Sequence, residues 1–148
     1  MANNTDKLLT IYQGKIDLHL VNFDNDSVGY YKEKIVALDT TNVKNIHDAA
    51  QFLLENLAQY DKAEKYYRLA LRQSLAQHGE AHEDVAESYG ALANLYCYKS
   101  QYGIAKEYFE KSISIQTNLS GENHKCVAEG YIGMGYVQSS LLNFEESL

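Results

Sequence analysis

Two histidines in the segment HGEAHED have the spacing of a metal site. His78 and His82 stand four residues apart, as in the zinc-binding HExxH motif, and three carboxylates lie in the same segment. Gly79 separates the histidines, however, and a catalytic zinc site needs a third protein ligand and an open coordination position. The spacing alone identifies no third ligand.

An architectural role accounts for the same segment. Asp84 precedes a helix that we predict to begin at Val85, and Glu87 follows at the spacing of a capping box, with Asp in place of Ser or Thr. Gly79 follows the preceding predicted helix and suits a C-cap in the left-handed conformation. The segment is therefore interpreted as a link between two helices.

A second copy of the segment supports this interpretation. Forty-two residues further on, SGENHKC keeps the glycine and the second histidine, His124, but has serine and cysteine where the first copy has His78 and Asp84. A metal site is not expected to lose two of its ligands in its own repeat. We therefore predict no metal ion and no cofactor.

The other candidates for catalysis lack partners. Cys97 stands between two tyrosines of a predicted helix, with no histidine or carboxylate at local spacing, so we expect it to pack as a small hydrophobic residue. Glycines at positions 130, 133 and 135 follow no predicted strand, as a nucleotide-binding loop requires, and suit close helix packing instead. The signature G-x-S-x-G does not occur. We predict no catalytic residues and no enzyme activity.

The composition favours a soluble helical domain. The 148 residues are 45% hydrophobic, enough for a core, and carry a net charge of −7, which repels nucleic-acid phosphates. No apolar run could span a membrane, and the absence of a secretion signal with only two cysteines favours a cytoplasmic location. The absence of proline favours helices throughout, and 13 tyrosines suit half-buried packing between them. We expect neither a nucleic-acid nor a membrane partner.

A period of 42 residues links three segments of the chain. Each segment contains two stripes of apolar residues at helical spacing, separated by a short polar break, which predicts a helical hairpin. The matches concentrate at small and aromatic positions: Ala63 with Ala105, Tyr67 with Phe109, Tyr89 with Tyr131, and Tyr60 with Tyr102 and Phe144.

The middle segment resembles a tetratricopeptide repeat (TPR). The pattern aromatic-x-x-Leu-Ala-x-x-Tyr, followed by small and aromatic residues, is carried by Tyr89, Leu92, Ala93, Tyr96, Ala105, Phe109 and Ser112. The usual period of the family is about 34 residues. A 42-residue period with Gly-x-x-His in the link is similar to the repeats of kinesin light chains. The resemblance implies an all-α, right-handed superhelical stack of antiparallel helical hairpins, a TPR-like α-solenoid.

The repeats divide the chain into four segments. Residues 1–42 form a degenerate leading hairpin or an N-terminal cap, and residues 43–84, 85–126 and 127–148 form repeat 1, repeat 2 and a truncated repeat 3. By the period, residues 143–148 would be the first turn of a second helix. The apolar side chains left uncovered would be Ile132, Met134, Tyr136 and Leu141. We expect either a fragment of a longer array or self-association through the C-terminal end.

In the family that the chain resembles, the first helices of the hairpins line a concave face. The corresponding peptide-binding positions are Asn45, Asp48, Phe52, Glu55, Asn56, Glu87, Asn94, Tyr98, Glu129 and Tyr136. Four carboxylates, three aromatic rings and no Lys or Arg suit a basic or amphipathic segment, unless acids merely solvate the groove and the working surface lies elsewhere. We expect a protein-protein interaction module that binds a peptide segment of a partner without catalysis. The alternative is a structural or oligomerising segment of a larger repeat protein.

Overall fold

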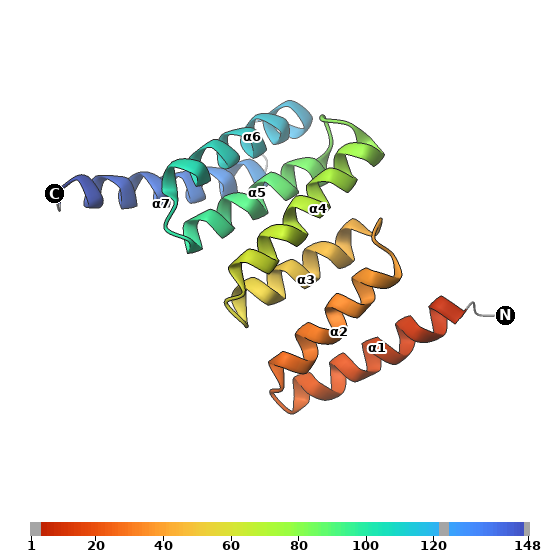
Figure 1. The fold of residues 1–148 in the computed structure, drawn as a ribbon. Helices are drawn as coiled ribbons and strands as arrows, with labels where there is room; N and C mark the ends of the chain where they lie inside the picture. Colours follow the sequence, from red (N-terminus) through yellow and green to blue (C-terminus); the bar gives the residue numbers. More distant parts are fainter. Residues whose placement is uncertain (1–3, 122–124, 147–148) are drawn as a thin grey trace. The chain divides into compact units, whose positions relative to one another are not determined.

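The computed structural model describes residues 4–121 and 125–146, and all regular secondary structure among them is α-helical (Figure 1). The helices are α1 (Asn4–Val21), α2 (Asn25–Leu38), α3 (Val43–Glu55), α4 (Tyr60–His78), α5 (Glu83–Tyr98), α6 (Tyr102–Ser120) and α7 (Lys125–Glu146). The predicted all-α class, an α-solenoid of helical hairpins, is confirmed. No helix among the described residues combines the length and hydrophobicity needed to cross a membrane.

A residue with positive φ terminates the first helix of each hairpin. Phe23, Ala58 and Ser100 have φ values of 56°, 51° and 56°, in the turns after α1, α3 and α5. In the last of these turns the N–H of Gln101 donates to the carbonyl of Tyr96 at 2.8 Å, which occupies an acceptor that the helix end would leave free. Ala58 and Ser100 are one 42-residue period apart, so the repeat in the sequence is also a repeat in backbone conformation.

The chain forms two compact units, residues 1–66 and 67–148. In the first unit α2 packs against both α1 and α3. Its core is built from one buried residue of α1, two of α2 and one of α3, with half-buried tyrosines around them: Ile16, Val28, Ile35 and Phe52, with Tyr12 and Tyr31. Burial of these apolar side chains holds the three helices together.

In the second unit α6 packs against α5 and α7. The predicted pairing of a small and a large residue on α6 is confirmed, since Ala105 and Phe109 are buried together with Tyr96 of α5 and Val137 of α7. A buried hydrogen bond also joins α6 to α5, because the hydroxyl of Ser112 donates to the carbonyl of Ala86 at 2.7 Å. The α5–α6 hairpin is therefore fixed by both packing and a hydrogen bond.

Glycines of α7 permit its close approach to α6. A Cβ atom added at Gly130 would lie 2.5 Å from Cγ1 of Ile113, and one added at Gly133 would overlap the ring of Phe109. Close packing was the predicted role of these glycines, and it is confirmed at both positions. Gly135 has no neighbour within 4 Å of such a Cβ atom, so the prediction is wrong there.

Two predicted helix boundaries are wrong. Helix α5 begins at Glu83 rather than Val85, and its N-cap is His82 rather than Asp84, because the imidazole Nδ1 accepts from the N–H of Asp84 at 3.2 Å. Helix α7 continues without a break to Glu146. Leu142, one period after Ser100, is helical, so the predicted break before a second helix does not form there; a leucine in the left-handed conformation would cost about 1 kcal/mol or more.

Candidate functional site

Four of the five predicted peptide-binding positions of the first unit line a small polar cavity. Helix α3 contributes most of its lining and α2 contributes Lys32; the lining residues are Lys32, Asp48, Gln51, Phe52, Glu55 and Asn56, around about 200 Å³. The ammonium of Lys32 lies 5.6 Å from the centroid of the Phe52 ring, within cation–π range. The ammonium of Lys32, from α2, therefore lies among the acidic residues of α3. The predicted set contained only residues of the first helices of the hairpins, so it could not include this cation.

Two residues of this set contribute less than expected. Phe52 is only 9% exposed and belongs to the core of the first unit, so its ring is chiefly a packing residue. Asn45 lies in the first turn of α3, where its N–H donates to the capping side chain of Asn42, and it is not among the lining residues of the cavity.

A larger and more apolar cavity lies in the second unit, between α5 and α7. It has a volume of about 430 Å³ and is lined by Asn94, Cys97 and Tyr98 of α5, Phe109 of α6, and Ile132, Gly133 and Tyr136 of α7. The lining positions of α5 and of α7 follow the three- and four-residue spacing of one helix face. Gly133 keeps the floor open, because any side chain there would meet Phe109. Three predicted positions, Asn94, Tyr98 and Tyr136, are thus brought together.

Tyr136 is oriented from the side by Tyr102. The two rings pack edge to face, with centroids 6.2 Å apart, and a hydrogen bond to the Tyr102 side chain raises the pKa of the Tyr136 phenol. Cys97 is half-buried in the wall, and this burial raises the pKa of its thiol. The cavity therefore presents neutral groups at pH 7, and its chemistry is that of an apolar receptor with polar edges.

The two predicted acids of the second unit stand outside this cavity. Glu87 and Glu129 are exposed, but neither lines it, and its lining contains no charged residue. The acidic character expected for the whole groove therefore applies to the first unit, through Asp48 and Glu55, while the cavity of the second unit is uncharged.

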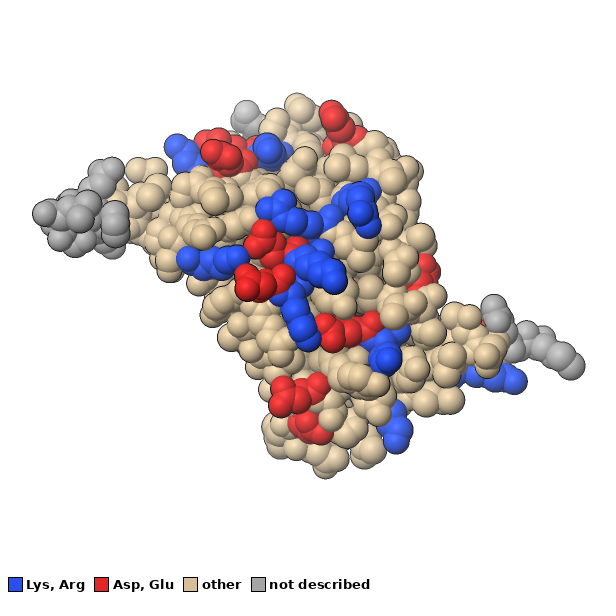
Figure 2. All heavy atoms as spheres, in the orientation of Figure 1, with Lys and Arg blue, Asp and Glu red and all other residues tan. Residues whose placement is uncertain are grey.

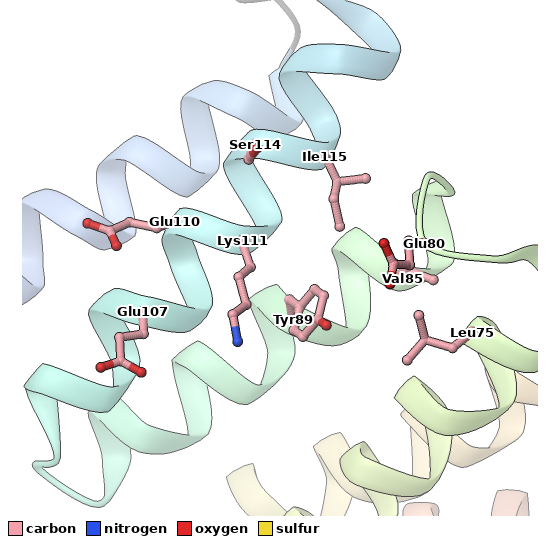
Figure 3. Close-up of a pocket in the computed structure, with 9 residues that line it drawn as sticks. All are labelled: Leu75, Glu80, Val85, Tyr89, Glu107, Glu110, Lys111, Ser114 and Ile115. Carbon is pink, nitrogen blue, oxygen red and sulfur yellow. The ribbon is translucent and has the colours of Figure 1, made fainter.

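Another cavity, of about 660 Å³, was missed by the sequence analysis (Figure 3). Its walls come from the end of α4, the link after it, α5 and α6, and contain Leu75, Glu80, Val85, Tyr89, Glu107, Glu110, Lys111, Ser114 and Ile115. Lys111 lies over the rings of Tyr89 and Tyr108, 5.6 and 5.5 Å from their centroids. Tyr89 was identified in the sequence only as a position of the repeat pattern and was not connected with residues of α4 and α6, so no local pattern indicated the cavity.

In the structure a third potential metal ligand, Asp84, lies close to the two histidines of HGEAHED, although the spacing in the sequence did not identify it. His78 ends α4, His82 caps α5, and their rings stack with centroids 3.9 Å apart. Oδ2 of Asp84 lies 3.2 Å from Nε2 of His78 and 3.6 Å from Nδ1 of His82. The segment is a link, as predicted, but it also gathers two imidazoles and a carboxylate. His124 of the second copy lies outside the described residues.

Charges of both signs intermingle on the face of the molecule shown in Figure 2. Lys and Arg alternate there with Asp and Glu. Two ion pairs of the described residues, each within one unit, are Lys62 with Glu33 at 3.4 Å and Lys106 with Glu110 at 3.9 Å. Exposed pairs of this kind contribute little to stability, and this face offers no broad area of a single sign.

Comparison with known proteins assigns the family. The tetratricopeptide repeat profile matches residues 44–118, about half of the chain. No curated protein sequence matches the chain. Among solved structures, BtubC (BKLC) from P. vanneervenii is similar over 97% of this chain and 60% of its own, with 21% identity and a TM-score of 0.78. The chain thus spans less than two thirds of the length of BtubC.

A second solved structure has the same fold at lower sequence identity. It is the N-terminal domain of stress-induced protein-1 (STI-1) from C. elegans, similar over 89% of this chain and 98% of its own, with 12% identity and a TM-score of 0.65. Both likenesses concern the fold, and the match of the profile fixes the family. The chain belongs to the tetratricopeptide repeat family, whose helical hairpins build protein-interaction modules.

Proposed function

We propose that this protein binds a peptide segment of a partner protein, without catalysis, and that a large apolar side chain of that segment enters the α5–α7 cavity. The observation that carries the proposal is the cavity itself. Its wall is uncharged, and Tyr98 and Tyr136 stand at its edge with 53% and 58% of their surfaces exposed. Exposed aromatic residues beside an apolar depression are typical of residues that dominate binding energy in protein interfaces.

The net charge of the chain favours a partner segment that is also basic. The charge of −7 raises the rate of encounter with a positive segment, an effect that is independent of how the two units are placed. Within the first unit, the acids Asp48 and Glu55 attract Lys or Arg, and the neighbouring Lys32 weakens that attraction. The proposed ligand is therefore an amphipathic peptide with one large apolar residue and several basic ones, and not a nucleic acid.

Binding of three labelled peptides of equal length, followed by fluorescence anisotropy, tests this proposal. The first carries Lys and Phe, the second replaces Lys with Glu, and the third replaces Phe with Ser. We expect the first to bind tightest, and Tyr136→Ala to weaken it by about tenfold, the effect of a moderate hot spot. Tyr131→Ala is the matched control, because Tyr131 lies on the same helix and is equally exposed but does not line the cavity. Preference for the acidic peptide, or an equal loss in both variants, would refute the proposal.

A second candidate is self-association through α7. Ile132 of α7 is 73% exposed, and an apolar side chain in this position gains free energy when a second copy covers it. Met134 and Leu141, expected to be exposed as well, pack partly against the core of the second unit. Light scattering after size exclusion tests for self-association. A monomer at tens of micromolar would exclude a dimer through α7, and the exposed face of α7 would then be free to bind the peptide.

A further inference from the structure

We propose that His78, His82 and Asp84 bind a divalent transition-metal ion such as Zn²⁺. Each offers one donor atom, and the donors lie within 4.8 Å of one another. Two imidazole nitrogens and one carboxylate oxygen are a donor set that zinc accepts, and they leave one tetrahedral position for water. Imidazole nitrogens select ions of this kind over Mg²⁺ and Ca²⁺, which prefer oxygen.

The three donors come from different local structures that the link holds together. His78 is the last residue of α4, Gly79 then turns the chain with φ of 77°, and Asp84 lies in the first turn of α5. The distance from Asp84 Oδ2 to Nε2 of His78, 3.2 Å, is close to the donor separation of about 3.3 Å around tetrahedral zinc. The spacing of His82 to Asp84 Oδ2, 3.6 Å, needs only a small contraction.

Burial does not oppose this rearrangement. The side chains of His78, His82 and Asp84 are partly open to solvent, so they can rotate without disturbing the core. The stacked imidazoles must tilt apart, because a metal ion lies in the plane of each ring that it binds. The ion would also meet the positive end of the α5 dipole, which the negative charge of Asp84 offsets.

Metal binding competes with the cap of α5. The only lone pair of Nδ1 of His82 accepts the N–H of Asp84 at 3.2 Å, so a metal at Nδ1 replaces that hydrogen bond. The bound ion then joins the end of α4 directly to the first turn of α5. The folded chain already holds the three donors close together, whereas the unfolded segment would have to be ordered first. Zn²⁺ therefore binds the folded chain more tightly and raises the unfolding temperature.

Variants that spare the cap test the proposal by calorimetric titration with Zn²⁺. His82→Asn keeps a capping side chain, because Asn is among the best N-caps, but removes the imidazole. His78→Gln removes the second nitrogen outside the cap. We expect one Zn²⁺ per wild-type chain, weakened at least about tenfold in each variant, and no binding of Mg²⁺. His19→Gln is the control, since His19 pairs with Asp24 at 2.9 Å and no third donor of the described residues joins this pair.

The unfolding temperature provides a second readout that does not depend on heat of binding. Zn²⁺ should raise it for the wild type and for His19→Gln, but not for His78→Gln or His82→Asn. If both ligand variants keep the wild-type affinity and thermal shift, the zinc binds elsewhere and the proposed site is wrong. Absence of binding to the wild type would also overturn it.

Discussion

The rings of Tyr102 and Tyr136 pack edge to face, with their planes inclined by 71°. Tyr102 is the first residue of α6 and Tyr136 lies on α7, so this contact orients a ring of the α5–α7 cavity from outside it. Edge-to-face pairs contribute about 0.5–1.5 kcal/mol beyond the area that they bury. The shape of the cavity edge therefore depends on a residue that does not line it.

Tyr102→Ala should weaken binding of the basic, Phe-containing peptide several-fold, because Tyr136 loses the ring that holds its orientation. Tyr102→Phe keeps that ring and loses only the hydroxyl, so it should retain most of the affinity. Fluorescence anisotropy measures both variants. Equal affinities for Ala and Phe at this position would show that the contact does not orient Tyr136.

Gly133→Ala should lower the free energy of unfolding by about 1–3 kcal/mol, the usual cost of overpacking a core. The added methyl group overlaps the ring of Phe109, which is 4% exposed and has little room to move. Gly135→Ala is the matched control, because its methyl group meets no neighbour and alanine favours the helix by up to about 1 kcal/mol. Urea denaturation distinguishes the two, and a destabilised Gly135→Ala with an unchanged Gly133→Ala would contradict the described packing of α6 against α7.

Much of the fold could be predicted from the sequence, including the close packing at Gly130 and Gly133. Helical periodicity and the 42-residue repeat were sufficient for the hairpins and for the small and large core positions, because both reflect local burial patterns. The first two helices, α1 and α2, do not follow the 42-residue period, because α2 has 14 residues whereas α4 and α6 have 19. Helix α3 is shorter as well, with 13 residues where α5 has 16, and the positive-φ residue Phe23 accordingly lies 35 residues before Ala58 rather than 42.

The parts that could not be predicted depend on contacts between elements. Lys32 of α2 lies beside the acidic residues of α3, and Asp84 contacts His78 across the turn at Gly79. The spacing of residues along the sequence indicates neither contact. The N-cap of α5 was misassigned because aspartate is a commoner cap than histidine, and only the backbone conformation of His82 decides between them.

Ser112→Ala should lower the free energy of unfolding by about 1 kcal/mol, because it removes a buried hydrogen bond to the carbonyl of Ala86. Ser114 lies two residues further along α6 and is exposed, so Ser114→Ala should have little effect. Thermal or urea unfolding provides the comparison. Equal stabilities for the two variants would mean that this bond adds nothing to the α5–α6 hairpin.

Cys97 should react slowly with a disulfide reagent at pH 8. Burial raises the pKa of its thiol, so less thiolate is present than in an unstructured peptide. Because the folded pKa is raised, the unfolded chain loses this proton first, and stability should fall as the pH rises above the ordinary pKa of a cysteine thiol. Cys126→Ser isolates the signal, and a rate equal to that of a cysteine peptide would contradict the burial of this side chain.

Methyl NMR of isoleucine side chains tests the central claim most directly, since it reports where a peptide binds. Ile132 lines the α5–α7 cavity, whereas Ile104 is exposed on α6 and lines none of the described cavities. On titration with the basic, Phe-containing peptide we predict that the Ile132 methyl resonances shift and that those of Ile104 stay unchanged. Binding that shifts Ile104 and leaves Ile132 unaffected would contradict the account.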